Sequence, residues 1–351
     1  MGEGVSKIAC INPGSSSLRY SVYAVDAEGE REILGRHVGG LDASNMAAFE
    51  KAVAAALDEI AVSNPDAIGY RLVHGGHRFS APVEIDDVVT GELRELIPMA
   101  PLHLPAAIDC IGLARRRFPQ LRHVACFDTA FHHPMPELAK RFALPEEYWD
   151  KGLRRYGFHG LSFAHVVETL GDELPSRVII AHLGSGSSLV ALLDGRPMDT
   201  TMGLTPTGGM MMGSRSGDLD PGVIIGLLRD GGLDVGQLER LLNQESGLKA
   251  VSGISSDMQQ LLEMSDQSPA AAMAVQMYCY HARKWIGALA AVLGGLDLLV
   301  FTGGIGENSQ TIRDRIGAGL EFLDCETKVV PSDEARMIAR STARVLSEDR
   351  A

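Results

Sequence analysis

Two stretches of the chain, about half its length apart, share one pattern of apolar and polar positions. Residues 8–18 and residues 179–189 each contain an apolar strand followed by a short segment rich in Gly and Ser. A second strand follows in each case, over residues 19–25 and 190–193. Glycine lets the backbone take positive φ and approach a ligand closely. Serine hydroxyls and freed N–H groups can converge on anionic oxygens. The repeat predicts a duplicated fold with phosphate held between its halves.

Helical and strand periods alternate along the rest of the chain. Apolar residues recur at helical spacing over residues 45–62,. Further helices are predicted over residues 106–117, 235–244, 269–293, 310–320 and 332–346, the last with Ser332 as its N-cap, and a helix that begins at residues 94–96 is interrupted by Pro98,. Strands are predicted over residues 6–25 (a hairpin), 67–73, 123–127 and 296–301, with a second strand-rich block from Val178. This alternation favours an α/β architecture.

The amino-acid composition and net charge limit which class of protein this is and which binding partners it can have. The 351 residues suffice for two domains, and contents of 45% apolar and 22% charged residues are ordinary for a soluble globular protein,. A net charge of −13 argues against nucleic-acid binding,, although a few arginines can still attract a small anion. We therefore expect a protein that binds neither nucleic acid nor membrane.

The remaining signals indicate a cytoplasmic protein. Five cysteines without a C-x-x-C pair predict buried free thiols in a reducing compartment,. No basic segment with an apolar core precedes Val5, so no signal peptide is expected,. The apolar stretch of residues 286–301 is broken by two glycines and Asp297, which argues against a membrane span,.

Two arginines stand out as candidate anion-binding groups. Arg71 lies inside an apolar strand, where a charge is costly unless it is paired,. An edge-strand ion pair and anion binding are equally good interpretations of it. Arg215 lies in a Gly- and Met-rich segment, residues 203–221, which is long enough to be either functional or disordered,. Its planar guanidinium suits a carboxylate or phosphate, whereas a flexible loop that merely contains an arginine is the alternative.

Three further positions carry candidate chemistry. Asp128 follows an apolar strand, where ligands gather in open α/β sheets, although it could instead cap a helix,. His132 and His133 do not share a helix face and are interpreted as structural or exposed, while His159 lies in a glycine-flanked turn from which it could reach a substrate. The glycine turn of residues 302–308 follows a buried strand and favours a nucleotide,.

Taken together, these motifs closely resemble the acetate kinase (acetate/propionate kinase) family over nearly the whole chain. The resemblance is carried by NPGSSS at residues 12–17, RLVHGG at 71–76, PLH at 101–103, FDTAFH at 127–132, YGFHG at 156–160, HLG at 182–184, MGSRSGD at 212–218, GISSD at 253–257 and FTGGIGEN at 301–308. It implies the actin-like fold, with two ribonuclease-H-like domains around a central cleft. It also implies reversible, Mg²⁺-dependent transfer of the γ-phosphoryl group of ATP to acetate or propionate, giving an acyl phosphate and ADP. Mn²⁺ could replace Mg²⁺.

The resemblance also implies a role for individual residues. Arg71, Asp128, His159 and Arg215 would be catalytic. Asn12 and Glu334 would lie near the metal ion. The substrate carboxylate and methyl group would be bound by Arg71, Val73, Leu102, Phe158 and Pro206. The nucleotide would be bound by Ser15, Ser17, His182, Gly184, Ser185, Gly186, Ser187, Asp257, Gly303, Gly304, Ile305, Gly306 and Asn308.

The same resemblance implies the domain boundaries and the oligomeric state, and departures from the family pattern leave other functions open. Residues 1–131 with 335–351 would form the first domain. Residues 132–334 would form the second, with the nucleotide site and most of a homodimer interface, to which the helix at 271–293 could contribute. Ser185 and Gln259 stand where the family usually has Asn and a basic residue, and Leu104 where it usually has Asn. They leave open a pyrophosphate donor, a longer acceptor such as butyrate, or a non-catalytic nucleotide-dependent regulator.

Overall fold

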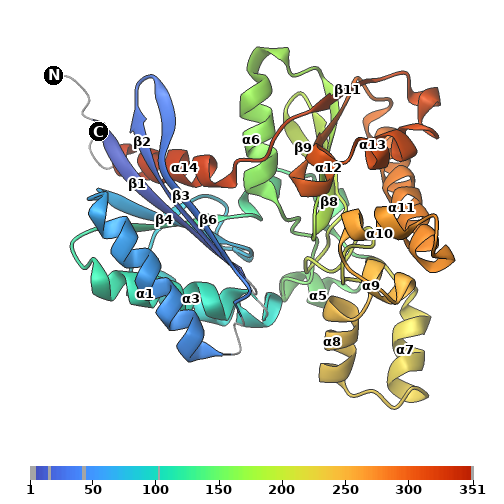
Figure 1. Ribbon diagram of the computed structural model, residues 1–351, viewed down its shortest axis with the longest axis horizontal. Coiled ribbons are helices and arrows are strands. Elements are labelled where there is room, and N and C mark those ends of the chain that lie inside the picture. Colours follow the sequence, from blue (N-terminus) through green and yellow to red (C-terminus); the bar gives the residue numbers. More distant parts are fainter. Residues whose placement is uncertain (1–4, 15–16, 42–44, 102, 349–351) are drawn as a thin grey trace. The chain divides into compact units, whose positions relative to one another are not determined.

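The computed structural model describes residues 5–14, 17–41, 45–101 and 103–348. The chain divides into two compact units. The first comprises Met1–His133, Phe158–His165 and Asp333–Ala351, and the second comprises Pro134–Gly157 and Val166–Ser332. Each unit contains one β-sheet with its own helices (Figure 1).

The sheet of the first unit contains the predicted N-terminal hairpin. Its strands are β1 (Ser6–Pro13), β2 (Ser17–Asp26), β3 (Gly29–Gly39), β4 (Ala67–Leu72), β5 (Val83–Glu84) and β6 (Arg122–Phe127), in the order β3-β2-β1-β4-β6-β5. The pairs β1–β2 and β2–β3 are antiparallel, whereas β1–β4 and β4–β6 are parallel. Strand β4 therefore lies inside the sheet.

The sheet of the second unit repeats this plan. Its strands are β7 (Arg177–Leu183), β8 (Ser187–Leu193), β9 (Arg196–Thr200), β10 (Leu298–Thr302) and β11 (Glu326–Val329), in the order β11-β10-β7-β8-β9. The pairs β7–β8 and β8–β9 are antiparallel, and β7–β10 and β10–β11 are parallel. Apart from the two-residue strand β5, both sheets have the same order and directions, so the predicted duplication is confirmed.

Alternating side chains of β1 explain why helices cover both faces of the first sheet. Ala9 and Ile11 belong to the core with α1 (Met46–Val62) and α3 (Leu104–Arg117), whereas Ile8 and Cys10 belong to the core with α14 (Glu334–Glu348). Successive residues of a strand point to opposite faces, and a strand buried on both faces is apolar throughout. Helix α14 therefore lies on the face opposite α1 and α3 (Figure 1).

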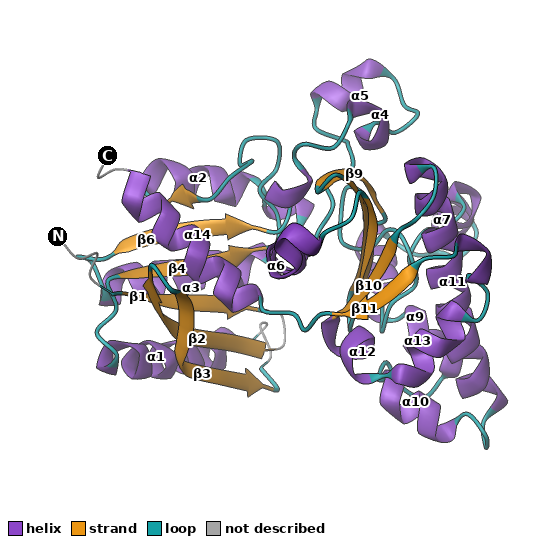
Figure 2. Cartoon of the chain, turned by 90° about the horizontal axis from the view of Figure 1, so that it is seen from above, coloured by secondary structure: helices purple, strands orange, loops and turns teal. Residues whose placement is uncertain are grey.

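The core of the second unit lies between its sheet and two helices. Ile179 and Ala181 of β7 belong to one core with residues of α11 (Pro269–Leu293) and α13 (Gln310–Gly317). Both helices lie beside the sheet in Figure 2. The segment at residues 203–221 has neither helix nor strand before α7 (Pro221–Arg229) begins, but it is ordered because Met210 and Met211 belong to this core and Met212 is also buried. The flexible side chain of methionine fits irregular gaps. The alternative of a disordered segment is therefore wrong.

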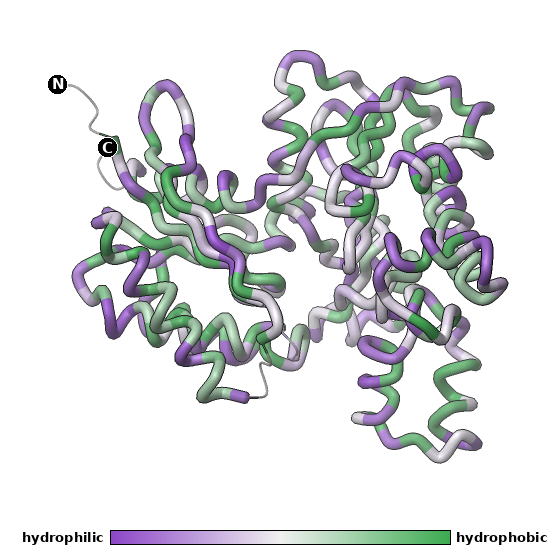
Figure 3. Tube along the Cα trace, in the orientation of Figure 1, coloured by the Kyte–Doolittle hydropathy of each residue, from purple (hydrophilic) through white to green (hydrophobic). Residues whose placement is uncertain are grey.

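The remaining helices are mostly short. They are α2 (Asp87–Glu95), α4 (Glu137–Lys140), α5 (Glu146–Asp150), α6 (Gly160–Leu170), α7 (Pro221–Arg229), α8 (Val235–Gln244), α9 (Gly247–Ser252), α10 (Met258–Met264) and α12 (Gly303–Asn308), with 3₁₀ turns at Ile97–Met99, Ala130–His132, Gly171–Glu173 and Glu321–Leu323. Helix α7 is largely apolar (Figure 3), yet its residues Val223, Ile225 and Leu228 are exposed.

Two local predictions are wrong. Residues 94–96 end α2 instead of beginning a helix, and Pro98 opens a 3₁₀ turn, where its missing N–H is harmless,. At the last helix, the Asp333 carboxylate accepts from Arg336 N at 2.9 Å. Asp333, and not Ser332, therefore caps α14, because both donors of Ser332 hydrogen-bond Glu307,.

Other predictions hold. All five cysteines are free, with four buried and Cys325 partly exposed. Among the described residues, no helix is both long and apolar enough to cross a membrane.

Candidate active site

Arg71 is the centre of a polar cluster in the first unit. Its Nε lies 3.1 and 3.0 Å from the two carboxylate oxygens of Asp128, and its Nη2 lies 2.7 Å from Oδ2. The Arg71 side chain is 19% exposed and the Asp128 side chain 1%. Because β4 lies between β1 and β6, the edge-strand interpretation of Arg71 is wrong. Asp128 is held by ionic hydrogen bonds instead of capping a helix through its side chain.

The other end of the Arg71 guanidinium faces the two predicted metal-binding residues. Nη1 donates to Asn12 Oδ1 at 3.3 Å and lies 3.4 Å from Glu334 Oε2. Asn12 Nδ2 donates to the same Glu334 oxygen at 3.1 Å. Asn12 comes from the end of β1 and Glu334 from the first turn of α14, so packing of α14 on the sheet brings them together.

Burial sets the electrostatics of this cluster. It raises the pKa of the Asp128 carboxyl to about 6, because the charge and hydrogen bonds of Arg71 offset the loss of water only in part and Glu334 adds a second negative charge. Burial disfavours the Arg71 cation, yet the neighbouring carboxylates Asp128 and Glu334 raise its pKa. Arg71 therefore stays charged, while Asp128 can change its charge near neutral pH.

The predicted metal residues have the donor chemistry that Mg²⁺ prefers. No group of three His, Cys, Asp or Glu side chains suited to a metal occurs in the described part of the chain. Mg²⁺, however, is commonly bound by one or two carboxylates together with water and substrate phosphates. The Glu334 and Asp128 carboxylates and the Asn12 amide oxygen provide hard oxygen donors of this kind. These residues fit the ion.

His159 lies in a turn attached to Asp128. The His159 backbone has a φ of 57°, which is uncommon for a residue with a side chain,. Its backbone N–H hydrogen-bonds the Asp128 carboxylate, and Gly160 N donates to the Asp128 carbonyl at 3.0 Å. A Cβ at Gly160 would lie 2.0 Å from that carbonyl oxygen, so only glycine fits. The turn therefore holds His159 beside the Arg71 cluster, 9% exposed.

The neighbouring histidine has a structural role, as predicted. His132 is buried, and its Nε2 hydrogen-bonds the Phe158 carbonyl at 2.9 Å. Burial lowers the pKa of His132 to about 4, so its ring is neutral. The bond fixes the backbone of Phe158, a residue predicted to bind substrate that is buried in the same unit, whereas Val73, just after β4, is partly exposed.

The predicted nucleotide-binding residues of the second unit gather at the carboxyl ends of β7 and β10. Gly184 to Gly186 form the turn between β7 and β8. A Cβ at Gly184 would lie 3.9 Å from Gly304 N, and one at Gly303 would lie 3.1 Å from the ring of His182. Gly303 has a φ of 77° and begins α12. His182 and the two glycine turns are therefore neighbours, with backbone N–H groups at the end of the sheet where ligands of α/β proteins bind.

The Ser187 hydroxyl holds the turn at residues 184–186 from inside the protein. Its Oγ donates to the Gly184 carbonyl at 3.1 Å, accepts from Gly184 N at 3.3 Å and lies 2.8 Å from the Tyr278 hydroxyl. A serine hydroxyl has one proton and two lone pairs, so Tyr278 must be the donor to Ser187. These three bonds use the full capacity of the Ser187 hydroxyl. The sequence gives no signal for Tyr278, which lies on α11.

Arg215 is anchored in the same unit. Its Nη1 donates to the Pro206 carbonyl at 3.2 Å, which joins a predicted catalytic residue to a predicted substrate-binding one. Gly213 N donates to the Ser185 carbonyl at 3.2 Å, so the loop that carries Arg215 contacts the glycine turn. Asp257 is exposed and caps α10 by accepting from Gln260 N.

The structure thus separates the predicted residues into two sets. The first unit gathers Asn12, Arg71, Asp128, His159 and Glu334, together with Val73, Phe158 and, after the first glycine turn, Ser17. The second unit gathers His182, Gly184, Ser185, Gly186, Ser187, Pro206, Arg215, Asp257, Gly303, Gly304, Ile305, Gly306 and Asn308. Ser15 and Leu102 lie outside the described residues.

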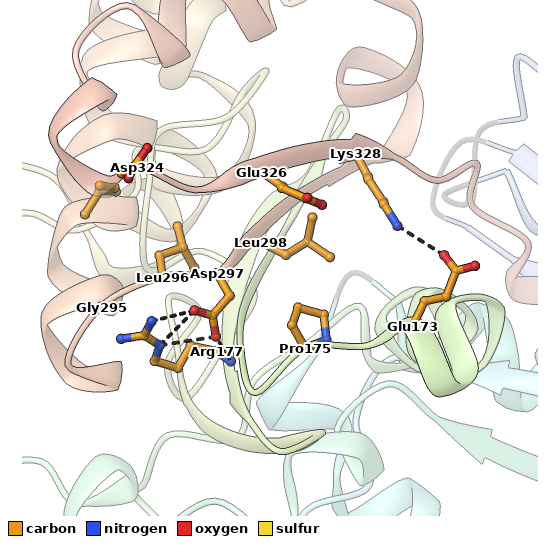
Figure 4. A pocket seen from close by; sticks show the side chains of 11 residues that line it. Glu173, Pro175, Arg177, Gly295, Leu296, Asp297, Leu298, Asp324, Glu326 and Lys328 are labelled. Carbon is orange, nitrogen blue, oxygen red and sulfur yellow. Dashed lines mark hydrogen bonds and ion pairs between the residues drawn. The ribbon is translucent and has the colours of Figure 1, made fainter.

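A pocket of about 550 Å³ lies at the opposite edge of the second sheet (Figure 4). Its lining includes the first residues of β7, β10 and β11 and contains none of the predicted site residues. Within it, Arg177 pairs with Asp297 and Lys328 with Glu173, and both basic side chains are thus matched by acids (Figure 4).

The strand order of both sheets, with a glycine turn after the first strand of each, defines the class of actin-like proteins built from two ribonuclease-H-like units. Comparison with known proteins specifies the family. The profile of the acetokinase family matches residues 7–350, and the chain belongs to this family.

Similar proteins have consistent names. A protein named acetate kinase from Rhodopseudomonas palustris (strain TIE-1) is 39% identical over 388 residues, covering 95% of this chain and 97% of its own. The crystal structure of Porphyromonas gingivalis acetate kinase has a TM-score of 0.82 at 36% identity and covers 97% of this chain and 100% of its own. The crystal structure of a propionate kinase from Francisella tularensis has a TM-score of 0.84 at 30% identity and covers 96% of this chain and 98% of its own.

Removal of the Tyr278 hydroxyl tests how the second glycine turn is held. Tyr278→Phe keeps the ring packed but deletes one buried donor, so we expect the second unit to lose about 1 kcal/mol of stability and its melting temperature to fall by roughly 2–4 °C. Ser187→Ala should cost more, because Gly184 then loses the partner of both its N–H and its carbonyl. Differential scanning calorimetry measures both. Tyr148→Phe, which removes a more exposed hydroxyl in the same unit, is the control, and equal melting temperatures for it and Tyr278→Phe would refute the assignment.

Proposed function

We propose that this chain is an acetate kinase, which transfers the γ-phosphoryl group of ATP to acetate or propionate reversibly, with Mg²⁺, giving an acyl phosphate and ADP. Membership of the acetokinase family supports the reaction class. The observation that carries the proposal is the buried Arg71–Asp128 pair with Asn12 and Glu334 on its other side, because it combines a fixed cation with oxygen donors for a metal ion. We further propose that the two compact units are the two catalytic domains.

The reaction needs positioning and charge neutralisation more than proton transfer. An acetate group is already ionised at neutral pH, so its oxygen can attack phosphorus without a strong base. Arg71 and Arg215 would bind the substrate carboxylate and the transferring phosphoryl group, and His159 would stabilise the charge that develops there. Asn12, Asp128 and Glu334 would hold Mg²⁺, which when bound neutralises phosphate charge.

The nucleotide would bind the second unit, where the turns at residues 184–186 and 303–304 lie near His182. The chain's apolar residues Val73, Phe158, Leu102 and Pro206 would surround the methyl group of the acceptor. Because one methylene is worth about 1–3 kcal/mol in an apolar pocket, we propose that both acetate and propionate are accepted.

Free thiols support a reducing, cytoplasmic location,.

Trapping the acyl phosphate with hydroxylamine tests the function. Purified protein should form acyl hydroxamate from acetate or propionate with ATP–Mg²⁺, and not from either acid with pyrophosphate–Mg²⁺. Arg71→Ala and Arg215→Ala should each lower kcat by about 10²–10³-fold, as expected for loss of one preorganised charge donor. The exposed Arg229→Ala is the control.

Each other outcome of this assay has a definite meaning. Product with pyrophosphate alone would show that Ser185 and Gln259 belong to an altered donor site; Gln259 hydrogen-bonds Glu263 on its own helix. Product with butyrate alone would show a longer acceptor. No product with any pair would favour a regulator.

The pKa of Asp128 predicts the acid limb of the pH profile. Its carboxyl has a pKa of about 6, and the ionised form is the one that pairs with Arg71. As pH falls through 6, protonation removes that charge, so kcat/KM for acetate should be constant above neutral pH and fall about tenfold per unit at low pH. Steady-state rates in constant-ionic-strength buffers give the profile. A flat profile to pH 5 would contradict the assignment, and Asp128→Asn should retain low activity without this limb.

We propose that the protein forms a homodimer through its second unit. Met273, Met277 and Tyr280 recur on one side of α11 and are 57%, 37% and 61% exposed, so they form an apolar stripe,. A second copy of the chain would cover it, as the family resemblance implies.

Met273→Glu should shift the dimer towards monomer in light scattering coupled to size exclusion. Val62→Glu, at an apolar residue 88% exposed in the first unit, should not. A monomeric wild-type protein at micromolar concentration would rule the dimer out.

A further inference from the structure

One carboxylate oxygen joins two distant segments of the second unit. Glu307 Oε1 accepts from Gly303 N at 2.9 Å, from Ser332 N at 2.8 Å and from Ser332 Oγ at 2.8 Å. Three donors on a single oxygen suit an ionised carboxylate, whose hydrogen bonds are stronger than those of a neutral acceptor. Glu307 lies on α12, one turn after Gly303.

The first segment is part of the proposed nucleotide site. Gly303 begins α12 with a φ of 77°, and a Cβ there would lie 2.8 Å from the Leu183 carbonyl oxygen and 3.1 Å from the ring of His182. Its N–H lies at the carboxyl end of β10 and donates to Glu307 Oε1, and Gly304 follows it in the same turn. The Glu307 carboxylate fixes the direction of this peptide group, and Arg313 binds the carbonyls of Gly306 and Glu307 at 2.8 Å at the other end of the same short helix.

The second segment is the place where the chain leaves the second unit. Ser332 is the last residue of that unit, and Asp333 and Glu334 belong to the first. We name residues 332–334 the crossover segment. Before it, Val330 is buried and its N–H donates to the Phe301 carbonyl at 3.0 Å. Pro331 restricts the backbone between them.

The far end of the crossover segment is fixed in the first unit. The Asp333 carboxylate accepts from the Tyr23 hydroxyl at 3.0 Å and from Arg336 N at 2.9 Å. Glu334 lies 3.4 Å from Arg71 Nη1 and accepts from Asn12 at 3.1 Å. Two peptide units therefore separate a residue bound to Glu307 from a carboxylate of the Arg71 cluster.

We propose that Glu307 is a positioning residue that couples occupation of the nucleotide turn to the position of Glu334 through the crossover segment. This inference rests on the proposed function. A hydrogen bond to Gly303 N alone would be an ordinary helix-end contact, but the two bonds to Ser332 serve no helix. A nucleotide that binds the turn beside Gly303 shifts the Gly303 peptide group, and Glu307, which accepts from its N–H, transmits the shift to Ser332. The coupling must be reciprocal, so acetate bound at Arg71 strengthens nucleotide binding by the same factor.

Four variants separate this role from simple stabilisation. Glu307→Ala removes all three bonds. Glu307→Gln keeps an oxygen acceptor of the same reach and is the conservative rescue. Ser332→Ala removes only the Oγ bond. Glu321→Ala, which removes an exposed acid of the same unit, is the matched control for lost charge.

Hydrogen exchange followed by mass spectrometry tests the tether without any ligand. In Glu307→Ala, amides of the crossover segment should exchange about tenfold faster than in wild type, as expected for loss of charge-assisted bonds. Glu307→Gln and Ser332→Ala should be intermediate, and Glu321→Ala unchanged. Equal exchange in wild type and all Glu307 variants would overturn the proposal, whether or not the protein is a kinase.

Calorimetric titration then measures the coupling. The probe is ADP–Mg²⁺, bound with and without acetate, and the ratio of the two dissociation constants is the coupling factor. We expect this factor to fall towards one in Glu307→Ala and to be largely restored in Glu307→Gln. A weaker ADP complex with an unchanged factor would show that Glu307 serves the nucleotide turn alone, which overturns the proposal. Absence of ADP binding in wild type would instead refute the proposed function.

Discussion

The placement of one guanidinium group inside a β-sheet constrains much of this protein. Arg71 lies on an inner strand, where water cannot solvate it fully, and an unpaired charge there would be very costly,. Two carboxylates from different elements, Asp128 after β6 and Glu334 on α14, meet that requirement. The strand order of the first unit and the return of the C-terminal helix to it are therefore conditions for keeping this cation in place.

The two sheets use the same plan for different chemistry. In both, an antiparallel hairpin is followed by parallel strands, and a glycine turn follows the first strand. In the first unit the strand ends carry charged side chains around Arg71, whereas in the second they carry glycine turns beside His182, in which Gly184 N donates to Ser187 and Gly303 N donates to Glu307. Charged side chains suit a small anion and a metal ion, and backbone donors suit phosphate oxygens.

Local features could be predicted from the sequence because local physics decides them. Apolar runs followed by Gly and Ser predicted the hairpins, and apolar residues at helical spacing predicted α1,. Contacts between distant residues carry no such signal. Tyr278 lies 91 residues from Ser187, and Asn12 lies 322 residues from Glu334. The error at Ser332 has the same origin, since Glu307, 25 residues earlier, binds the hydroxyl that local reasoning assigned to a helix cap. The family resemblance supplied the residues of the Arg71 cluster, but their mutual hydrogen bonds required the structure.

Each unit is formed by separate segments of the chain, and this affects how the protein folds during its synthesis. Asn12 and Glu334 are hydrogen-bonded although 322 residues separate them. A ribosome adds roughly 5–20 residues per second, so the partner of Asn12 is synthesised on the order of 20–60 s later. Throughout that interval the nascent first sheet lacks α14, which contributes to the core around Ile8 and Cys10, although Leu161 and Ala164 of α6 in the same core are made earlier. Vectorial synthesis therefore leaves part of this apolar sheet face uncovered until α14 has been made, and transiently exposed apolar surface of this kind is the reason that nascent chains need chaperones.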